Sequence, residues 1–236
     1  MASKVLLVLT SQAHLGEGGM AAGSWLEELA APYWVLHDAG CVPVFASIRG
    51  GAAPLDPASR AAPWLTDDGR RLLDDGEAMA LLGATPSLAA LDADGFDAIF
   101  LVGGAAVMWD FPHDALLGRL LRRFADSGRA YGGVCHGVAG LLNPHAGPDF
   151  VKGRRLTCIS DREDALAGYD KLVPFMPEAP LRAAGAILSF AAEPFGSHAV
   201  RDGLLVTGQN PASAGACGQL LIEALATRTR AEPVGA

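Results

Sequence analysis

The sequence has a deficit of positive charge. Its 236 residues include 18 Lys and Arg against 26 Asp and Glu, which gives a net charge of −8. A nucleic-acid-binding face needs a concentrated positive stripe. The longest basic clusters here are the pairs Arg122-Arg123 and Arg154-Arg155. We therefore expect no nucleic-acid partner.

Long hydrophobic runs are also lacking. No apolar run approaches the ~20 residues that a helix needs to cross a membrane, so no membrane association is expected. The run VLLVL at residues 5–9 is shorter than the ~7–15 apolar residues of a secretory signal. It is better interpreted as a buried first strand.

Closely spaced cysteines are absent. Cys41, Cys135, Cys158 and Cys217 lie far apart, with no Cys-x-x-Cys pair. This spacing excludes a zinc-finger pattern, and a chain of this size does not depend on a disulfide framework. The histidines likewise have no spacing that suggests metal ligands. We expect reduced thiols, a cytoplasmic location and no metal site.

Hydrophobic residues are plentiful enough for a substantial core. They make up 50% of the chain, and charged residues make up 19%, which is typical of a folded domain. Apolar runs of strand length alternate with segments whose apolar residues recur at helical spacing. The expected strands cover residues 4–9, 41–47, 96–104, 130–135, 155–160 and 203–208, and the expected helices cover 23–40, 113–128 and 211–228, with a further helix starting at 136.

This alternation predicts an α/β fold, in which a mostly parallel sheet carries helices on both faces. We expect a single domain over residues 1–236. Residues 50–76 contain Gly-Gly, three prolines and many aspartates. They are interpreted as an excursion with short helices and not as a separate domain. Pro32 is expected to kink or break the first helix. Ligands of such sheets bind at the carboxyl ends of the strands.

The segment YGGVCHGVAG at residues 131–140 contains a candidate nucleophile, Cys135. A cysteine at the end of a strand is often only a packing residue. Here Gly133 precedes it and Gly137 follows it, and small neighbours are what a sharp strand–nucleophile–helix turn requires. The free N–H groups at the start of a helix would stabilise its thiolate.

His136 follows directly, and two interpretations of its side chain are open. It is either the acid–base partner of the thiol or a residue that only shapes the turn, with its ring pointing away. In both cases its backbone N–H would point towards an oxyanion on a bound carbonyl.

These residues sit within a pattern that resembles the ThiJ/PfpI superfamily, in its glyoxalase III-like branch. The resemblance runs almost end to end and implies a flavodoxin-like sandwich related to class I glutamine amidotransferases, with Cys135 at a nucleophile elbow. Its segments, in order, are KVLLVLTS, GSWLEELAAPY, PLDP (54–57), LVGG with MWDFP, VCHG, LTCISDREDALAG, LVPFMPEAPL and LVTGQNPASA.

The resemblance implies roles for named residues. Cys135 matches the nucleophile and His136 the neighbouring histidine. Glu28 matches a carboxyl group from the first helix beside the sulfur, with Glu27 as the fallback. A carboxylate would repel a thiolate, so this acid is expected to be protonated and to move a proton during the reaction.

A further acid can orient the histidine. By the resemblance, Asp164 is the match and Asp161 the next candidate; the alternative is that this acidic run is a solvated loop. Gly104 and Ala105 match the backbone donors of the oxyanion hole, and Trp109 could line the crevice or belong to the core. The sequence departs from its relatives at 103–106, where Gly-Gly-Ala-Ala replaces Gly-Gly-His-Gly. The substrate is therefore in doubt.

Taken with these departures, the resemblance implies a cofactor-independent cysteine enzyme that acts on a small carbonyl compound. The expected reaction converts a 2-oxoaldehyde into a 2-hydroxy acid. One alternative is hydrolysis or hydration of another small substrate, such as an amide or an isonitrile. A second alternative is a stress chaperone or a redox sensor, with Cys135 oxidised. Relatives often form homodimers, so a homodimer is expected.

Overall fold

The computed structural model describes residues 2–17 and 19–231, and these form a six-stranded sheet with the order β2-β1-β3-β4-β8-β7. The first five strands in this order are parallel, and β7 is antiparallel to β8. The strands are β1 (Lys4–Leu9), β2 (Val42–Ser47), β3 (Ala98–Leu101), β4 (Ala130–Val134), β7 (Ala199–Asp202) and β8 (Leu205–Gly208).

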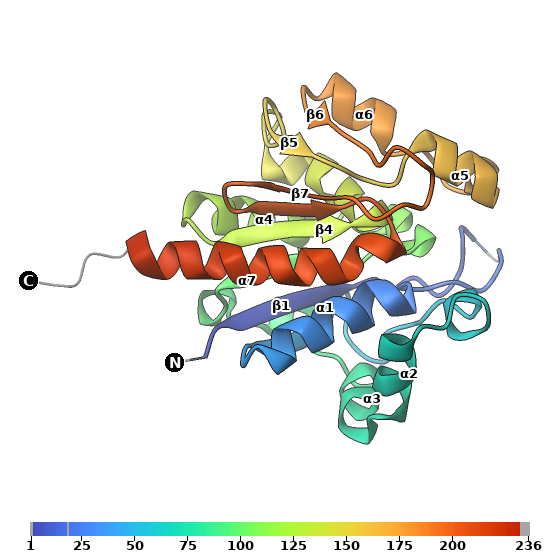
Figure 1. The fold of residues 1–236 in the computed structure, drawn as a ribbon, viewed down its shortest axis with the longest axis horizontal. Coiled ribbons are helices and arrows are strands. Elements are labelled where there is room, and N and C mark those ends of the chain that lie inside the picture. Colours follow the sequence, from blue (N-terminus) through green and yellow to red (C-terminus); the bar gives the residue numbers. More distant parts are fainter. Residues whose placement is uncertain (1, 18, 232–236) are drawn as a thin grey trace, which may run out of the picture.

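Apolar residues alternate between the two faces of the sheet. Along β1, Val5 and Leu7 pack into one core, and Leu6 and Val8 into the other. Helices α1 (Leu26–Asp38) and α7 (Ala214–Ala231) cover the first face, and α4 (Ala115–Asp126) covers the second (Figure 1). Because both faces are covered, the central strands β1 and β3 are apolar on both faces along most of their length. The predicted α/β sandwich with helices on both faces is confirmed.

Smaller elements complete the described chain. Helices α2 (Asp67–Asp74) and α3 (Gly76–Gly83) follow β2, and α5 (Asp161–Ala167) and α6 (Glu178–Ala183) lie beyond the β7 edge (Figure 1). None of the helices in the described residues is long and apolar enough to cross a membrane. The 3₁₀ helices are η1 (Ala58–Arg60), η2 (Leu88–Ala90), η3 (Ala93–Gly95), η4 (Ala105–Trp109), η5 (Cys135–Leu142), η6 (Pro144–Ala146), η7 (Tyr169–Lys171) and η8 (Pro211–Ser213).

Helix α1 continues through Pro32, so of the expected kink or break the break is absent. The expected helix after Cys135 is present as a 3₁₀ helix. One local prediction differs from the structure. Of the expected strand at 155–160, only β5 (Arg155–Leu156) is extended, and it pairs with β6 (Ile187–Leu188) in a separate sheet. The place beside β8 in the main sheet is already taken by β7, which the sequence pattern did not indicate.

The excursion at 50–76 packs against the start of α1. The Asp56 N–H donates to the Ser24 carbonyl at 2.9 Å, and the Leu26 N–H donates to the Ser59 hydroxyl at 3.0 Å. Both Asp56 and Ser59 are buried. These bonds satisfy backbone groups at the N-terminus of α1, where a helix lacks internal acceptors. The excursion therefore fixes the first turn of α1, which faces the candidate site.

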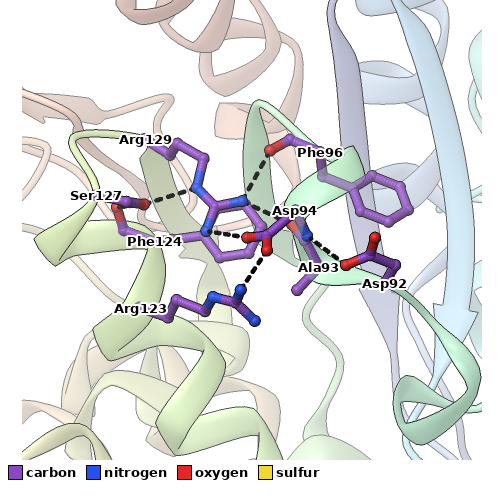
Figure 2. Close-up of polar contacts among 8 residues, drawn as sticks. All are labelled: Asp92, Ala93, Asp94, Phe96, Arg123, Phe124, Ser127 and Arg129. Carbon is purple, nitrogen blue, oxygen red and sulfur yellow. Dashed lines mark hydrogen bonds and ion pairs between the residues drawn. The ribbon is translucent and has the colours of Figure 1, made fainter.

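At the end of the sheet opposite the candidate site, the buried Arg129 links the segments that lead into β3 and β4 (Figure 2). Its guanidinium donates to the carbonyls of Ala93 and Phe96, and it stacks on the Phe124 ring at 3.9 Å. Asp94 pairs with it at 3.8 Å and also contacts Arg123. Arg129 directly precedes β4, and Phe96 lies two residues before β3. This cluster therefore links the starts of the two central strands.

Candidate active site

A cavity of about 400 Å³ opens where the chain leaves the carboxyl ends of β3 and β4. This is the edge at which doubly wound sheets bind their ligands. Cys135 lies at its inner end and is 5% exposed. The first turn of α1 forms one side, and residues of α5 form another.

Cys135 occupies a strained turn between β4 and η5. Its φ is +57°, in the left-handed region that residues other than glycine rarely adopt. Such a conformation costs of order 1–3 kcal/mol and persists only when the surroundings enforce it. Gly137 is part of that enforcement, since a Cβ there would lie 2.6 Å from the Leu101 carbonyl oxygen at the end of β3. The predicted strand–nucleophile–helix turn is present.

His136 and Asp164 extend from the thiol as a chain of three groups. His136 Nδ1 is 3.5 Å from Cys135 Sγ, and His136 Nε2 is 3.0 Å from Asp164 Oδ1. Both side chains are almost fully buried. The ring N–H is not aligned for a hydrogen bond with the carboxylate, and such bonds often tighten only when a substrate binds. Of the two predicted acids, Asp164 lines the cavity, and Asp161 does not.

Glu28 lies on the other side of the sulfur, fully buried in the first turn of α1. The Trp25 N–H donates to the Gly103 carbonyl at 2.9 Å, which ties this turn to the end of β3. A Cβ on Gly103 would lie 2.2 Å from Glu28 Oε2 and 3.0 Å from Cys135 Cβ. The carboxyl and the thiol therefore meet in a space that only glycine leaves open.

Burial raises the pKa of Glu28 well above its usual range, although the Cys135 thiol and the Gly103 N–H hold it down in part. Burial therefore favours the protonated carboxyl group over the charged carboxylate. The neighbouring acid, Glu27, also lines the cavity but accepts a hydrogen bond from the Thr66 hydroxyl. Of the two predicted carboxyls, Glu28 is the one that interacts with the sulfur.

The sequence-based expectation of a stabilised thiolate differs from the structure. Burial raises the pKa of the Cys135 thiol, and the neighbouring carboxyl groups of Glu28 and Asp164 raise it further. The His136 N–H at the start of η5 lowers it, but this effect is smaller. Cys135 is therefore a neutral thiol in the resting protein, and a base must remove its proton for it to act as a nucleophile.

Two of the three predicted binding residues line the cavity. Gly104 and Ala105 do so, at the point where η4 begins. N–H groups in a first helical turn are not used inside the helix and are free to face a ligand. Trp109 does not line the cavity; it is partly buried against the second core and lies beside Gly16. Its predicted role as a lining residue is therefore not supported.

Sequence reasoning missed the aromatic wall of the cavity, which consists of Trp25, Trp64, Tyr169 and Phe195. The Trp25 and Trp64 rings meet edge to face at 5.9 Å. The Tyr169 ring lies 6.0 Å from the His136 ring, and burial raises the pKa of the Tyr169 hydroxyl to about 12. These residues come from four separate segments, so no local pattern in the sequence marks them.

Glu163 is a second residue whose position was missed, although a local signal existed. It caps α5 with Ser160 in a Ser-x-x-Glu capping box. Its carboxylate also accepts hydrogen bonds from Gln209 and Asn210, both at 2.8 Å, and from the Phe195 N–H at 2.7 Å. Burial alone would raise the pKa of Glu163, but these hydrogen bonds lower it below its ordinary value. The charged carboxylate therefore holds three loops around the cavity.

No group of three His, Cys, Asp or Glu side chains among the described residues is arranged to hold a metal ion. The polar side chains at the inner end of the cavity are those of a thiol, an imidazole and two carboxyl groups. Such a set can add a sulfur nucleophile to a carbonyl carbon and move protons on both sides of it.

Comparison with known proteins places this arrangement in context. The DJ-1/PfpI family model matches residues 21–224. The structure is similar to Rapid Encystment Protein 24 kDa of Francisella tularensis, with a TM-score of 0.88 and 31% identity over 94% of this chain and 99% of that one. It is also similar to glyoxalase III of Candida albicans, with a TM-score of 0.82 and 25% identity over 94% and 97% of the two chains. The glutathione-independent glyoxalase HSP31 of Saccharomyces cerevisiae is 27% identical over 94% of this chain and 98% of its own.

Proposed function

The chain belongs to the DJ-1/PfpI family, and from this premise we propose that it is a cysteine-dependent enzyme of the glyoxalase III type. The substrate is a 2-oxoaldehyde, and the product is the corresponding 2-hydroxy acid. The observation that carries the proposal is the buried Cys135 in the lining of a cavity, with its Sγ 3.5 Å from His136 Nδ1 and in contact with the buried Glu28 carboxyl. Relatives of the chain named as glyoxalases support the same reaction.

In the first step, His136 Nδ1 takes the thiol proton and Sγ bonds to the aldehyde carbon. The Asp164 carboxylate, 3.0 Å from His136 Nε2, stabilises the imidazolium that forms. The oxygen of the aldehyde becomes an oxyanion and takes a proton to give a hemithioacetal. The backbone N–H groups of Ala105 and His136 are the donors that we assign to this oxyanion.

In the second step, Glu28 moves a proton between the two substrate carbons. The hydrogen on the former aldehyde carbon leaves as a proton, the neighbouring ketone oxygen is protonated, and an enediol forms. Return of a proton to the second carbon, with loss of the proton on the oxygen of the first carbon, gives a thioester of a 2-hydroxy acid. Water then adds to the thioester carbonyl, the C–S bond breaks, and the thiol leaves with a proton. The net reaction adds one water, and no electron acceptor is required.

The raised pKa of Glu28 suits this role, since a carboxyl group whose pKa lies nearer to neutrality both donates and accepts protons. The raised pKa of the Cys135 thiol is unfavourable for a redox sensor, which needs an exposed thiol of low pKa. The interaction partner under this proposal is therefore a small carbonyl compound. The cytoplasmic location, the homodimer and the independence from any cofactor stay predictions.

The test is formation of the 2-hydroxy acid lactate from methylglyoxal without glutathione. Cys135→Ala should abolish turnover, and Glu28→Gln should lower kcat about 10²- to 10⁴-fold because it removes the proton carrier. Cys41→Ala is the matched control, since Cys41 is a free cysteine that does not line the cavity. Absence of hydroxy acid from every 2-oxoaldehyde supplied to the wild type would reject the proposal.

A further inference from the structure

The cavity is large for the smallest 2-oxoaldehydes. Its volume is about 400 Å³, and pockets of ~300–1,000 Å³ are the size that holds drug-like ligands. A three-carbon substrate bound to Cys135 would leave most of this space to water. Ala105 adds to the room in the cavity, because its side chain stops at Cβ.

The outer part of the cavity is aromatic. Trp64 and Phe195 are 48% and 42% exposed, and no other aromatic side chain among the described residues is classed as exposed. Both line this one cavity. Exposed apolar surface of this kind, gathered at the mouth of a cleft, is typical of a site that an apolar ligand covers.

Two features keep these rings at the mouth. Phe195 has a φ of +62°, a strained conformation, and its backbone N–H is held by the Glu163 carboxylate at 2.7 Å. Trp64 packs edge to face against Trp25 at the start of α1. A strained backbone such as that of Phe195 persists only where the surrounding structure enforces it. The aromatic mouth is therefore a fixed part of the site.

The charge of the lining limits the substrate further. The carboxyl groups of Glu27 and Asp164 line the cavity in addition to the protonated Glu28, whereas none of the described residues that line it is a lysine or an arginine. An anionic substrate would meet like charge and find no cation to pair with. The walls therefore favour an uncharged molecule with an apolar substituent.

From the size, the rings and the charge, we propose that the substrate is an uncharged 2-oxoaldehyde with an aryl or comparably bulky apolar group. This group lies between Trp64 and Phe195 while Cys135 Sγ attacks the aldehyde carbon. The inference rests on the proposed function for its chemistry, but its recognition part depends only on the walls of the cavity. Aromatic contacts contribute about 0.5–1.5 kcal/mol each beyond simple burial, which corresponds to about two- to tenfold in kcat/KM for each ring.

The experiment compares kcat/KM for phenylglyoxal, methylglyoxal and the anion 4-carboxyphenylglyoxal. The wild type should prefer phenylglyoxal over methylglyoxal by about tenfold and should turn over 4-carboxyphenylglyoxal more slowly than phenylglyoxal. Trp64→Ala and Phe195→Ala should each lower the ratio of the phenylglyoxal value to the methylglyoxal value. Leu81→Ala, which removes an exposed apolar side chain outside the cavity, should change neither. A value for methylglyoxal equal to or above that for phenylglyoxal in the wild type, or faster turnover of 4-carboxyphenylglyoxal than of phenylglyoxal, overturns the inference.

A binding measurement separates this inference from the proposed reaction. Calorimetry with Cys135→Ser, which lacks the thiol, measures the affinity for 1-phenyl-1,2-propanedione, a diketone without an aldehyde. Binding that Trp64→Ala weakens in that background supports the aromatic site even if no aldehyde is turned over, in which case only the proposed reaction fails. Turnover of both aldehydes without binding of the diketone leaves the reaction standing and overturns the aryl preference.

Discussion

Gly103→Ala tests the closeness of the thiol and the carboxyl group directly. The added methyl would lie 2.2 Å from Glu28 Oε2, 2.4 Å from the Val134 carbonyl oxygen and 3.0 Å from Cys135 Cβ. The Val134 carbonyl belongs to β4 and has little freedom to move. The Glu28 carboxyl must therefore retreat by roughly 1 Å, and a misplacement of that size costs about 10²-fold in rate. The overpacking itself costs about 1–3 kcal/mol of stability.

The assay combines kcat/KM for a 2-oxoaldehyde with the free energy of unfolding in urea. Gly76→Ala is the matched control, because nothing lies within 4 Å of a Cβ at that position in α3, and it should be neutral or slightly stabilising. The variant Gly103→Ala should remain folded at 25 °C and lose about 10²-fold in kcat/KM. Wild-type activity in folded Gly103→Ala would refute the close approach of Glu28 to the thiol.

Three further predictions concern stability. Burial raises the pKa of Asp110 to about 6 from 3.8. Both states are protonated well below pH 3.8, so the contribution of Asp110 to stability should fall by roughly 3 kcal/mol between pH 3 and pH 7, and urea titrations of Asp110→Asn should lack this loss. Glu163→Gln replaces one accepting carboxylate oxygen with an NH₂ group that faces hydrogen-bond donors, and it should lower the free energy of unfolding by about 2–5 kcal/mol. The loss should be largest above the ordinary carboxyl pKa, because the lowered pKa of Glu163 means that its charged form stabilises the fold. Thermal unfolding at pH 5 and pH 8 checks this. Arg129→Met should lower the free energy of unfolding by about 2–4 kcal/mol, because it leaves the Ala93 and Phe96 carbonyls without their hydrogen-bond donor. The value of kcat should stay unchanged, since the cluster lies at the end of the sheet opposite the cavity. Unaltered stability would show that the cluster in Figure 2 contributes little.

The main architecture was predictable because local patterns of apolar residues mark its strands and helices. The continuous apolar run at β1 and the apolar stripe of α4 each follow the period of one element. The strand β7 was missed because its residues, Ala199–Asp202, are half-buried on both faces and show neither pattern. Its pairing with β8 is decided by the turn between them, which also excludes the segment at 155–160 from the main sheet.

The candidate site was predictable where a motif or a resemblance marked it, and not elsewhere. Cys135, His136 and Asp164 lie together as expected. The ionisation of the thiol was predicted wrongly, because a helix N-terminus is visible in sequence, whereas burial and carboxyl groups that are distant along the chain are not. Phe195 reaches the cavity only because Glu163 holds its backbone, a tertiary contact that no local pattern indicates.

The division between the inner end and the walls of the cavity has a consequence for how such a protein diversifies. The sulfur and its proton carriers are anchored by β3, β4 and the first turn of α1, where a single added methyl is disruptive. Trp64, by contrast, comes from the excursion at 50–76, and Phe195 from a loop before β7. Substitutions of these wall residues can change which compound the cavity binds, while the residues of the reactive centre stay the same.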